Sequence, residues 1–357
     1  MNIVPSTNNT KEAWERIEPM EEDLAYQEHA LLGVSRTFAL TIPRLPKTLR
    51  IVVGNAYLLC RIADTIEDSA SLSVDEKGRF SKLFADVVAG SGSAEELAHG
   101  LYPRLDHSTT PEEQELIRHI PAVIRVTETF PTNMRTPLYR CVRIMTEGME
   151  TFQEGRFADG LKDMPHMDAY CYCVAGIVGE MLTDLFRAYN PRIDARGEAL
   201  ASLAVSFGQG LQMTNILKDI WEDKQRGACW LPQEVFKQHG FELTSLSIGN
   251  HGEGFQRGLD QLIGYARGHL ENALRYTLLI PRRETGIREF CLWAIGMAVL
   301  TLRNIHRHKD FTRGKDVKIS RRSVYAVVMG SRCISKSNSL LRLAFSLLCA
   351  GLPESPR

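Results

Sequence analysis

Apolar residues recur at helical spacing along most of the 357-residue chain, whereas alternating strand patterns are scarce. This periodicity predicts long helices over residues 47–68, 111–128, 133–155, 167–189, 195–223, 254–279, 284–306 and 320–349. Pro131, Pro191 and Pro281 fall between these segments, where proline can end one helix and begin another. No break is long enough, or biased enough in composition, to be a domain linker. The sequence therefore predicts one all-α domain.

Charge and cysteine content exclude several classes of function. Lys+Arg and Asp+Glu both number 43, so there is no global basic field to hold a nucleic acid. The eight cysteines form no C-x-x-C pair and lie mostly in apolar segments, which indicates reduced thiols in a reducing, cytoplasmic compartment. No signal peptide is visible, and the longest charge-free apolar runs, 290–302 and 343–351, are shorter than the roughly 20 residues of a membrane helix. We expect a cytoplasmic protein that does not bind nucleic acid.

The spacing D-x-x-E-D occurs twice, in predicted helices with apolar flanks. The first acidic segment contains Asp64, Glu67 and Asp68, which share one helix face at i, i+3 and i+4. The second acidic segment comprises Asn215, Asp219, Glu222 and Asp223. Solvated faces with ion pairs to nearby cations are one interpretation. Metal binding is the other, since carboxylates stacked on one face repel unless a cation neutralises them.

Oxygen ligands without paired His or Cys favour Mg²⁺ over zinc. Mg²⁺ held by few carboxylates takes its other ligands from water and phosphate oxygens, which suits a diphosphate leaving group. The expected metal ligands are Asp64, Glu67, Asp68, Asn215, Asp219 and Asp223. Cations that could complete a diphosphate clamp are Arg36, Arg61, Lys218 and Arg226. Apolar helix faces could then shelter a hydrocarbon cation from water.

Four ordered motifs carry a family resemblance. They are S-R-T-F at 35–38, Y-x-x-x-R-x-x-D-T-I-E-D at 57–68, Y-C-Y-C-V-A-G-x-V-G at 170–179 and Q-x-T-N-I-x-x-D-x-x-E-D at 212–223, followed by W-L-P-Q-E at 230–234. The chain resembles the squalene/phytoene synthase family, the head-to-head isoprenoid synthases, over about residues 27–330. The resemblance implies an all-α isoprenoid-synthase bundle with a central apolar cavity. It also implies an N-terminal extension at 1–26 and a C-terminal helix and tail at 331–357.

The resemblance also implies roles for individual residues. Asp64, Asp68, Asp219 and Asp223 would act in catalysis through Mg²⁺, and Tyr170 would lie near the carbocation or take part in proton removal. Further residues would contact the substrate, either because the resemblance implies it or because their positive charge suits diphosphate. They are Ser35, Arg36, Phe38, Tyr57, Arg61, Val174, Gly179, Gln212, Asn215, Lys218 and Arg226. Without the resemblance, Tyr170 would be read as a core tyrosine, and the glycines as helix-packing positions.

The family reaction joins two prenyl diphosphates through a cyclopropyl diphosphate. The basic segment 316–322 is similar to a segment of the reductive members, so Lys318, Ser320 and Arg321 could hold the phosphates of NADPH; a solvated basic loop is the alternative. We therefore expect squalene formation from farnesyl diphosphate with Mg²⁺ and NADPH. Dehydrosqualene or phytoene formation without a reductant remains open. A terpene cyclase, a head-to-tail prenyltransferase and a non-catalytic lipid-binding protein fit the motifs less well.

Residues 340–350 form an apolar segment with basic neighbours. The segment suits a helix on a membrane surface or one packed on the domain. We expect a monomer with weak peripheral membrane association.

Overall fold

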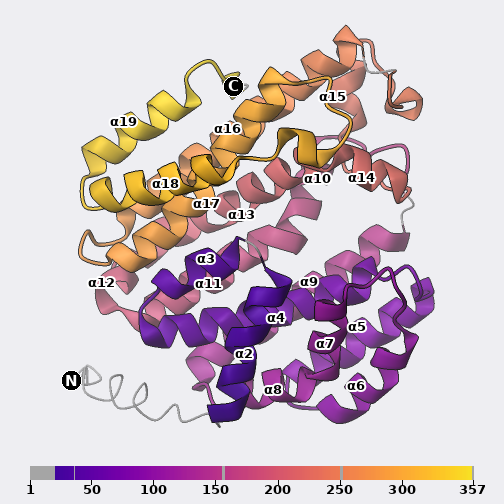
Figure 1. The fold of residues 1–357 in the computed structure, drawn as a ribbon, viewed down its shortest axis with the longest axis vertical. Helices are drawn as coiled ribbons and strands as arrows, with labels where there is room; N and C mark the ends of the chain where they lie inside the picture. The colour runs from indigo at the N-terminus through magenta and orange to yellow at the C-terminus, as the bar shows by residue number, and fades with distance from the viewer. Residues whose placement is uncertain (1–20, 36, 155–156, 250–251, 356–357) are drawn as a thin grey trace. The chain divides into compact units, whose positions relative to one another are not determined.

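The computed structural model describes residues 21–35, 37–154, 157–249 and 252–355, with backbone alone at 153 and 154. The regular elements in these ranges are helices, and an isolated β-bridge joins Leu161 to Pro232. The predicted all-α class is confirmed. Contacts divide the chain into two compact units, whose helices are labelled in Figure 1. The first unit contains Met1–Glu150 and Asp184–Tyr189, and the second contains Thr151–Thr183 and Asn190–Arg357.

The first unit is built from short and long helices in sequence order. Its elements are α2 (Glu21–Val34), α3 (Phe38–Thr41), η1 (Ile42–Arg44), α4 (Lys47–Asp68), α5 (Val74–Val88), α6 (Ala94–Leu101), η2 (Tyr102–Arg104), α7 (Pro111–Arg118), α8 (Ile120–Glu128) and most of α9 (Thr132–Glu154). Helices α2, α5 and α6 were not predicted from periodicity. The predicted helix 111–128 is two helices, because Pro121 in the first turn of α8 lacks the N–H that would continue α7.

Helix α4 is the central helix of the first unit and ends in the first acidic segment. It begins after Pro46 and buries an apolar face that includes Leu58, Leu59 and Ile62. Asn55 is buried on the same helix, where its side-chain amide donates to the Val123 carbonyl oxygen of α8 at 2.9 Å. Because both polar and apolar contacts fix α4, its last two turns have a defined orientation within the unit. The predicted bounds 47–68 are confirmed.

The second unit contains the remaining elements. They are α10 (Met164–Cys171), the π-helical turn η3 (Tyr172–Gly176), the start of α11 (Ile177–Tyr189), α12 (Pro191–Asp194), α13 (Gly197–Lys218), α14 (Ile220–Gln225), α15 (Gln233–Lys237), η4 (Leu243–Ser245), α16 (Glu253–Leu279), α17 (Thr285–Arg307), η5 (Gly314–Val317), α18 (Arg321–Ile334) and α19 (Asn338–Cys349). Helices α13, α16 and α17 pack against one another around the core of this unit.

Close backbone approach holds α13 against the η3–α11 segment. A Cβ atom at Gly179 would lie 2.1 Å from the Ala204 carbonyl oxygen, and one at Gly208 would lie 2.0 Å from the Ala175 carbonyl oxygen. Glycine is therefore required on both sides of this contact. The predicted helix 167–189 ends where the structure has it but begins three residues late, since the helical stretch is Met164–Tyr189. It also contains the π-helical turn, which widens the helix for five residues.

Two further predicted helices are divided. The segment 195–223 breaks at Asp219, between α13 and α14, and 320–349 breaks between α18 and α19. Over the described residues, two helical stretches, Met164–Tyr189 and Thr285–Arg307, are long and apolar enough to cross a membrane by length and composition. In Thr285–Arg307, 78% of the apolar window is buried in the structure, as in the core helix of a folded domain.

Candidate active site

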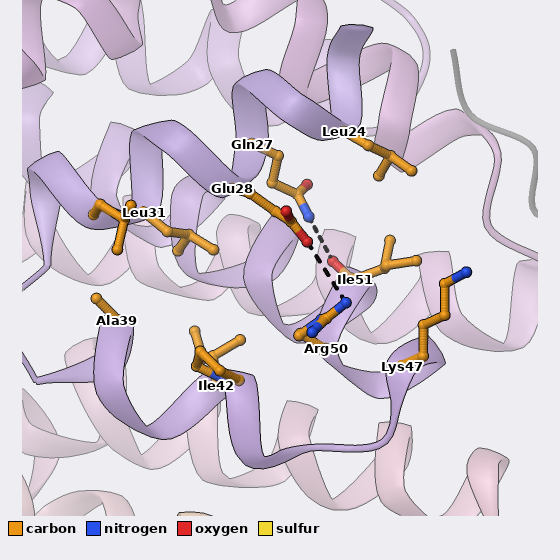
Figure 2. Close-up of a pocket in the computed structure, with 11 residues that line it drawn as sticks. Leu24, Gln27, Glu28, Leu31, Ala39, Ile42, Lys47, Arg50 and Ile51 are labelled. Atoms are coloured by element: carbon orange, nitrogen blue, oxygen red, sulfur yellow. Dashed lines mark hydrogen bonds and ion pairs between the residues drawn. The ribbon is translucent and has the colours of Figure 1, made fainter. Parts of the chain in front are cut away.

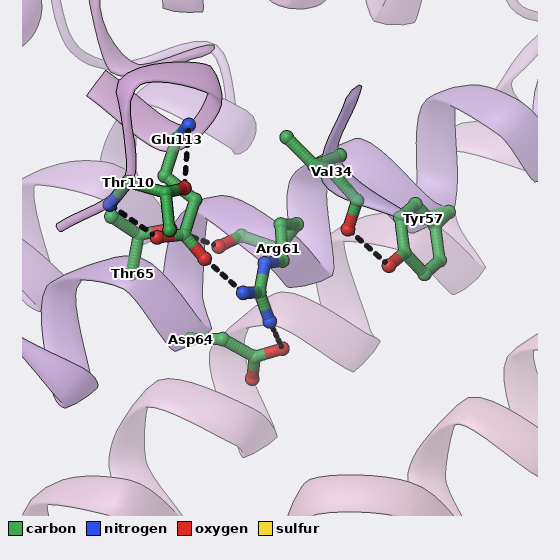
Figure 3. A network of polar contacts seen from close by, with 7 residues as sticks. All are labelled: Val34, Tyr57, Arg61, Asp64, Thr65, Thr110 and Glu113. Carbon is green, nitrogen blue, oxygen red and sulfur yellow. Dashed lines mark hydrogen bonds and ion pairs between the residues drawn. The ribbon is translucent and has the colours of Figure 1, made fainter. Parts of the chain in front are cut away.

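The first acidic segment occupies the last two turns of α4, and its geometry depends on Arg61 (Figure 3). The guanidinium of Arg61 lies between two carboxylates: its Nη1 is 3.8 Å from Asp64 Oδ2, and its Nη2 pairs with Glu113 Oε1. Glu113 is itself fixed at the start of α7, where it forms a capping box with Thr110. Arg61 is therefore held by a second helix as well as by its own.

Electrostatics in this segment favour an added cation. Desolvation raises the pKa of Asp64 to about 7; Arg61 lowers it, while the Asp68 and Glu113 carboxylates raise it further. Burial also acts on Glu113, but Arg61 and the Thr110 hydrogen bonds outweigh it and hold the pKa of that carboxyl below its usual range. Arg61 is thus shared between Asp64 and Glu113, and its attraction does not offset the desolvation of Asp64, whose pKa stays raised.

Several predicted substrate contacts lie together on the amino-terminal side of Arg61. The Tyr57 hydroxyl donates to the Val34 carbonyl oxygen at 3.1 Å, and its ring centroid lies 5.3 Å from that of Phe38. Ser35 is buried and accepts the Phe38 N–H at 2.9 Å. The structure therefore brings Ser35, Phe38, Tyr57 and Arg61 into one connected group. Arg36 lies outside the described residues.

Two residues of this region were missed in the sequence. One is Glu113; the other is Lys77 of α5, whose ammonium donates to the Glu67 carbonyl oxygen. Desolvation lowers the pKa of Lys77, while Glu67 and Asp68 raise it, so the ammonium lies near the acidic segment. Glu113 is the last residue of a capping box, T-x-x-E at 110–113, and Lys77 follows another, S-x-x-E at 73–76, so a search for helix starts could have found them.

The second acidic segment follows the junction of α13 and α14. Asp219 stands at this junction, and its N–H still donates to the Asn215 carbonyl oxygen at 2.9 Å, so the helical spacing continues through the break. Lys218 Nζ lies 3.0 Å from Asp219 Oδ2, and Arg226 donates to Asp223 Oδ1 at 2.7 Å. The predicted cations Lys218 and Arg226 are therefore paired with the predicted metal ligands of their own segment.

Desolvation is also the main influence on Asp219. Desolvation raises the pKa of this carboxyl, and the Glu222 carboxylate adds to the rise. The cations Lys218 and Arg226 act in the opposite direction and lower the pKa. The net direction is upward, as for Asp64, although Lys218 lies within contact distance. A divalent cation bound at each segment would stabilise the carboxylate of that segment in its ionised form.

A turn far along the chain lies against the second acidic segment. The backbone N–H of Gly314 donates to Glu222 Oε1 at 2.8 Å, and a Cβ atom at Gly314 would lie 2.7 Å from Asp219 Oδ1. Glu222 Oε2 is buried, and within the described part of the chain no hydrogen-bond partner reaches it. The turn η5 thus fixes one oxygen of Glu222 and limits the position of Asp219. Sequence reasoning did not identify Gly314.

The predicted cofactor residues follow directly after this turn. Lys318, Ser320 and Arg321 are exposed. The Ser320 hydroxyl caps α18 by accepting the Ser323 N–H at 3.1 Å. The structure therefore gives Ser320 a helix-capping role, and the assignment of the three residues to NADPH stays a prediction.

Tyr170 belongs to an aromatic cluster in the core of the second unit. Its ring stacks on Trp230 with centroids 4.0 Å apart and planes inclined by 5°, and Phe152 meets it edge-on at 5.1 Å. Val174 lies in the π-helical turn, one residue before the close contact of Ala175 with α13. Gly179 makes the other close contact with α13, so its packing role is observed, and its role in substrate binding stays a prediction. Gln212 is half-buried on α13.

The side-chain oxygens of the two acidic segments can be compared with the ligands that Mg²⁺ requires. Searching the described ranges, we find no three His, Cys, Asp or Glu side chains that converge closely enough to hold a metal ion alone. Each acidic segment instead offers oxygen donors, with Asp64 and Asp219 destabilised as anions. This suits Mg²⁺, which binds few carboxylates and completes its coordination with water and phosphate oxygens. The residues fit a magnesium–diphosphate complex and do not fit a closed, all-protein metal cage.

A separate hollow of about 280 Å³ lies in the first unit between α2 and the α3–α4 segment (Figure 2). Its lining is largely apolar, and its charged side chains include Glu28 and Arg50, which lie 3.6 Å apart. Gln27 closes one side by donating to the Ile51 carbonyl oxygen at 2.9 Å. No described residue of the predicted site lines this hollow, so we do not assign it to substrate.

Solved structures share the fold of this chain. A solved complex of TcSQS with the ligand BPH1237 superposes with a TM-score of 0.74 at 22% identity, covering 94% of each chain. A solved dehydrosqualene synthase complex gives a TM-score of 0.63 at 21% identity, covering 92% of this chain and 99% of that one. The chain therefore shares its all-helical fold with both solved structures.

The squalene/phytoene synthase family model matches residues 31–323, and the chain belongs to this family. The family resemblance drawn from the four motifs is thus confirmed. Squalene synthase ERG9 of Gibberella zeae is 28% identical over 292 residues, which are 80% of this chain. The match covers 59% of that relative, so the chain spans about three fifths of its length.

Proposed function

We propose that the chain is a squalene synthase that condenses two farnesyl diphosphates head to head and reduces the cyclopropyl diphosphate intermediate with NADPH. The observation that carries the proposal is the pair of D-x-x-E-D segments, in each of which desolvation raises the pKa of the leading aspartate. Such carboxylates need cations, and a diphosphate with Mg²⁺ supplies them together with its own ligands. Squalene synthases among the named relatives support the choice of product.

In this proposal, Asp64, Glu67 and Asp68 would hold Mg²⁺ in the first unit, and Asn215, Asp219 and Asp223 would do so in the second. Bound Mg²⁺ neutralises the charge that develops on diphosphate as the C–O bond breaks. Arg61 would add hydrogen bonds to the diphosphate, and Glu113 would orient its guanidinium for that contact.

Tyr170 and its neighbours would act on the hydrocarbon part of the reaction. The Tyr170 ring is buried and its stack on Trp230 keeps it rigid, so its orientation is set before substrate binds. An aromatic face stabilises positive charge, and the apolar surroundings exclude the water that would quench a carbocation. The phenol hydroxyl would assist proton removal during formation of the cyclopropane ring.

The reductive step is proposed from the segment that follows Gly314. Lys318 and Arg321 are exposed cations that could bind the phosphates of NADPH, and their segment begins at the turn that contacts Glu222 and Asp219. A member without this step would form dehydrosqualene or phytoene. The fold similarity to a dehydrosqualene synthase keeps that alternative in view.

Product analysis by gas chromatography and mass spectrometry tests the proposal. The purified chain would receive farnesyl diphosphate and Mg²⁺ with and without NADPH, alongside a parallel reaction with geranylgeranyl diphosphate. We expect squalene only when NADPH is present. Dehydrosqualene under both conditions, or phytoene from the longer substrate, would replace the reductive proposal with the alternative.

A further inference from the structure

The hollow between α2 and the α3–α4 segment, here called the α2–α4 hollow, has mainly apolar walls (Figure 2). Leu24, Leu31 and Leu32 line it from α2, and Ile42 and Ile51 line it from η1 and α4. Leu32 is 71% exposed, so much of this wall meets water. The volume of about 280 Å³ is close to the lower end of the range for small-molecule pockets. The hollow therefore suits a short hydrocarbon chain.

The α4 side of the α2–α4 hollow is positively charged. Lys47 and Arg50 line the hollow from the first turn of α4, and Glu28 lies 3.6 Å from Arg50 and offsets one of these charges. Pro46 precedes α4 and gives it no side-chain cap, so the first N–H groups of this helix add a partial positive charge. This side of the hollow therefore attracts an anion.

Two buried polar atoms of lining residues have no hydrogen-bond partner within the part of the chain that the structure describes. They are Arg50 Nε and Gln27 Oε1. Buried polar groups in folded proteins are nearly always paired, so each such atom calls for an explanation. Arg50 Nε is a donor, and an anionic oxygen is the acceptor that suits it best. The unmet hydrogen bonding therefore points to a bound molecule.

We propose that the α2–α4 hollow binds a small amphipathic anion, with a short hydrocarbon chain and a phosphate or carboxylate head group. The chain would lie against the leucines of α2, and the head group would contact Lys47 and Arg50. A neutral apolar molecule would leave these cations without a partner, and an inorganic anion would leave the apolar walls in water. No described residue of the predicted active site lines the hollow, so the proposal does not depend on the reaction that the chain catalyses.

Isothermal titration calorimetry of the full chain tests the proposal, with decyl phosphate as the probe at concentrations where it forms no micelles. EDTA is present, so that the acidic segments hold no Mg²⁺ and repel the phosphate. We expect saturable binding of one molecule per chain. Butyl phosphate and decanol should each bind at least about tenfold more weakly, because the first lacks most of the chain and the second lacks the charge.

Two variants test whether decyl phosphate binds in the α2–α4 hollow. Lys47→Gln with Arg50→Gln should weaken its binding by at least about tenfold, because the change removes charge-assisted hydrogen bonds to the head group. Ala39 is a small residue of the same wall. Ala39→Phe should also weaken binding by at least about tenfold, because the larger side chain occupies the space of the hydrocarbon chain.

Matched controls use a second hollow of the first unit, which Arg79, Lys82 and Ala85 of α5 line. Arg79→Gln with Lys82→Gln, and separately Ala85→Phe, should leave decyl phosphate binding unchanged. Circular dichroism would show that all variants are folded.

Four results would overturn the proposal. They are no saturable binding of decyl phosphate to wild type, wild-type affinity in both hollow variants, an equal loss in the controls, and butyl phosphate binding as tightly as decyl phosphate. A dimer in sedimentation equilibrium that Ala39→Phe dissociates would also overturn it, because a second copy of the chain would then fill the hollow.

Discussion

Replacing Gly314 with alanine tests how the second acidic segment is positioned. The new methyl group would lie 2.7 Å from Asp219 Oδ1 and 3.0 Å from the Lys218 carbonyl oxygen. The carboxylate is the end of a side chain and can rotate away, whereas the carbonyl belongs to the helix end and yields less. We therefore expect a small loss of stability, about 1 kcal/mol, because relief of the overlap needs only a side-chain rotation and a slight shift.

The effect on catalysis should be larger than the effect on folding. Displacement of a catalytic group by about 1 Å can cost roughly 100-fold in rate. We expect kcat/KM for farnesyl diphosphate to fall by about 10- to 100-fold, and the Mg²⁺ concentration for half-maximal rate to rise. Steady-state kinetics across a Mg²⁺ titration, with thermal unfolding of the same sample, separates the two effects. Mn²⁺ binding followed by electron paramagnetic resonance gives a readout that does not depend on turnover.

Gly330→Ala is the matched control for this experiment. Gly330 lies on α18 with open space where a Cβ atom would be, so alanine should leave activity unchanged and stabilise the helix by up to about 1 kcal/mol. Wild-type kcat/KM and Mn²⁺ affinity in Gly314→Ala would refute the positioning argument. Equal activity losses in both glycine variants would refute it as well.

Three further substitutions test separate parts of the account. Asp64→Asn should lower turnover at saturating Mg²⁺ by at least about 100-fold. It should not lower the melting temperature, because asparagine removes a desolvated charge and has the same shape as aspartate. Unchanged turnover would refute the metal assignment. Tyr170→Phe keeps the stack on Trp230 and should slow formation of the cyclopropyl intermediate, measured by product trapping, whereas full activity would reduce Tyr170 to a packing role. Gly208→Ala should lower the free energy of unfolding of the second unit by about 3 kcal/mol in urea, because the alanine Cβ would lie 2.0 Å from the Ala175 carbonyl oxygen. Wild-type stability in this variant would contradict the close helix contact.

The sequence predicted helices best where a long apolar face has a clear start. Helix α4 has both: Pro46 precedes it and its apolar face is continuous, so the predicted and observed bounds coincide. Short helices such as α6 were missed because eight residues hold too little periodicity. The break at Asp219 was missed because no proline or run of turn residues stands there in the sequence. The break after Ile334 does contain such a run, Ser335, Ser337, Asn338 and Ser339, which the prediction of one helix over 320–349 passed over.

In the candidate site, the sequence predicted the residues that lie within one helix but not their partners from other helices. The acidic segments and Arg61 were found because their spacing within one helix is visible in the sequence. Glu113 is 52 residues away from Arg61, and Gly314 is 92 residues away from Glu222. Such contacts depend on tertiary packing, which single-helix periodicity does not encode. The capping motif that contains Glu113 was visible in the sequence, but the pairing of Glu113 with Arg61 was not.

The most direct test of the central claim is a reaction of labelled farnesyl diphosphate with Mg²⁺ and no reductant. We expect a cyclopropyl diphosphate product that forms with wild type, fails to form with Asp64→Asn or Asp219→Asn, and turns into squalene when NADPH is added. Farnesol, a cyclic terpene or a head-to-tail product in its place, or a cyclopropyl diphosphate that forms without Mg²⁺, would contradict it.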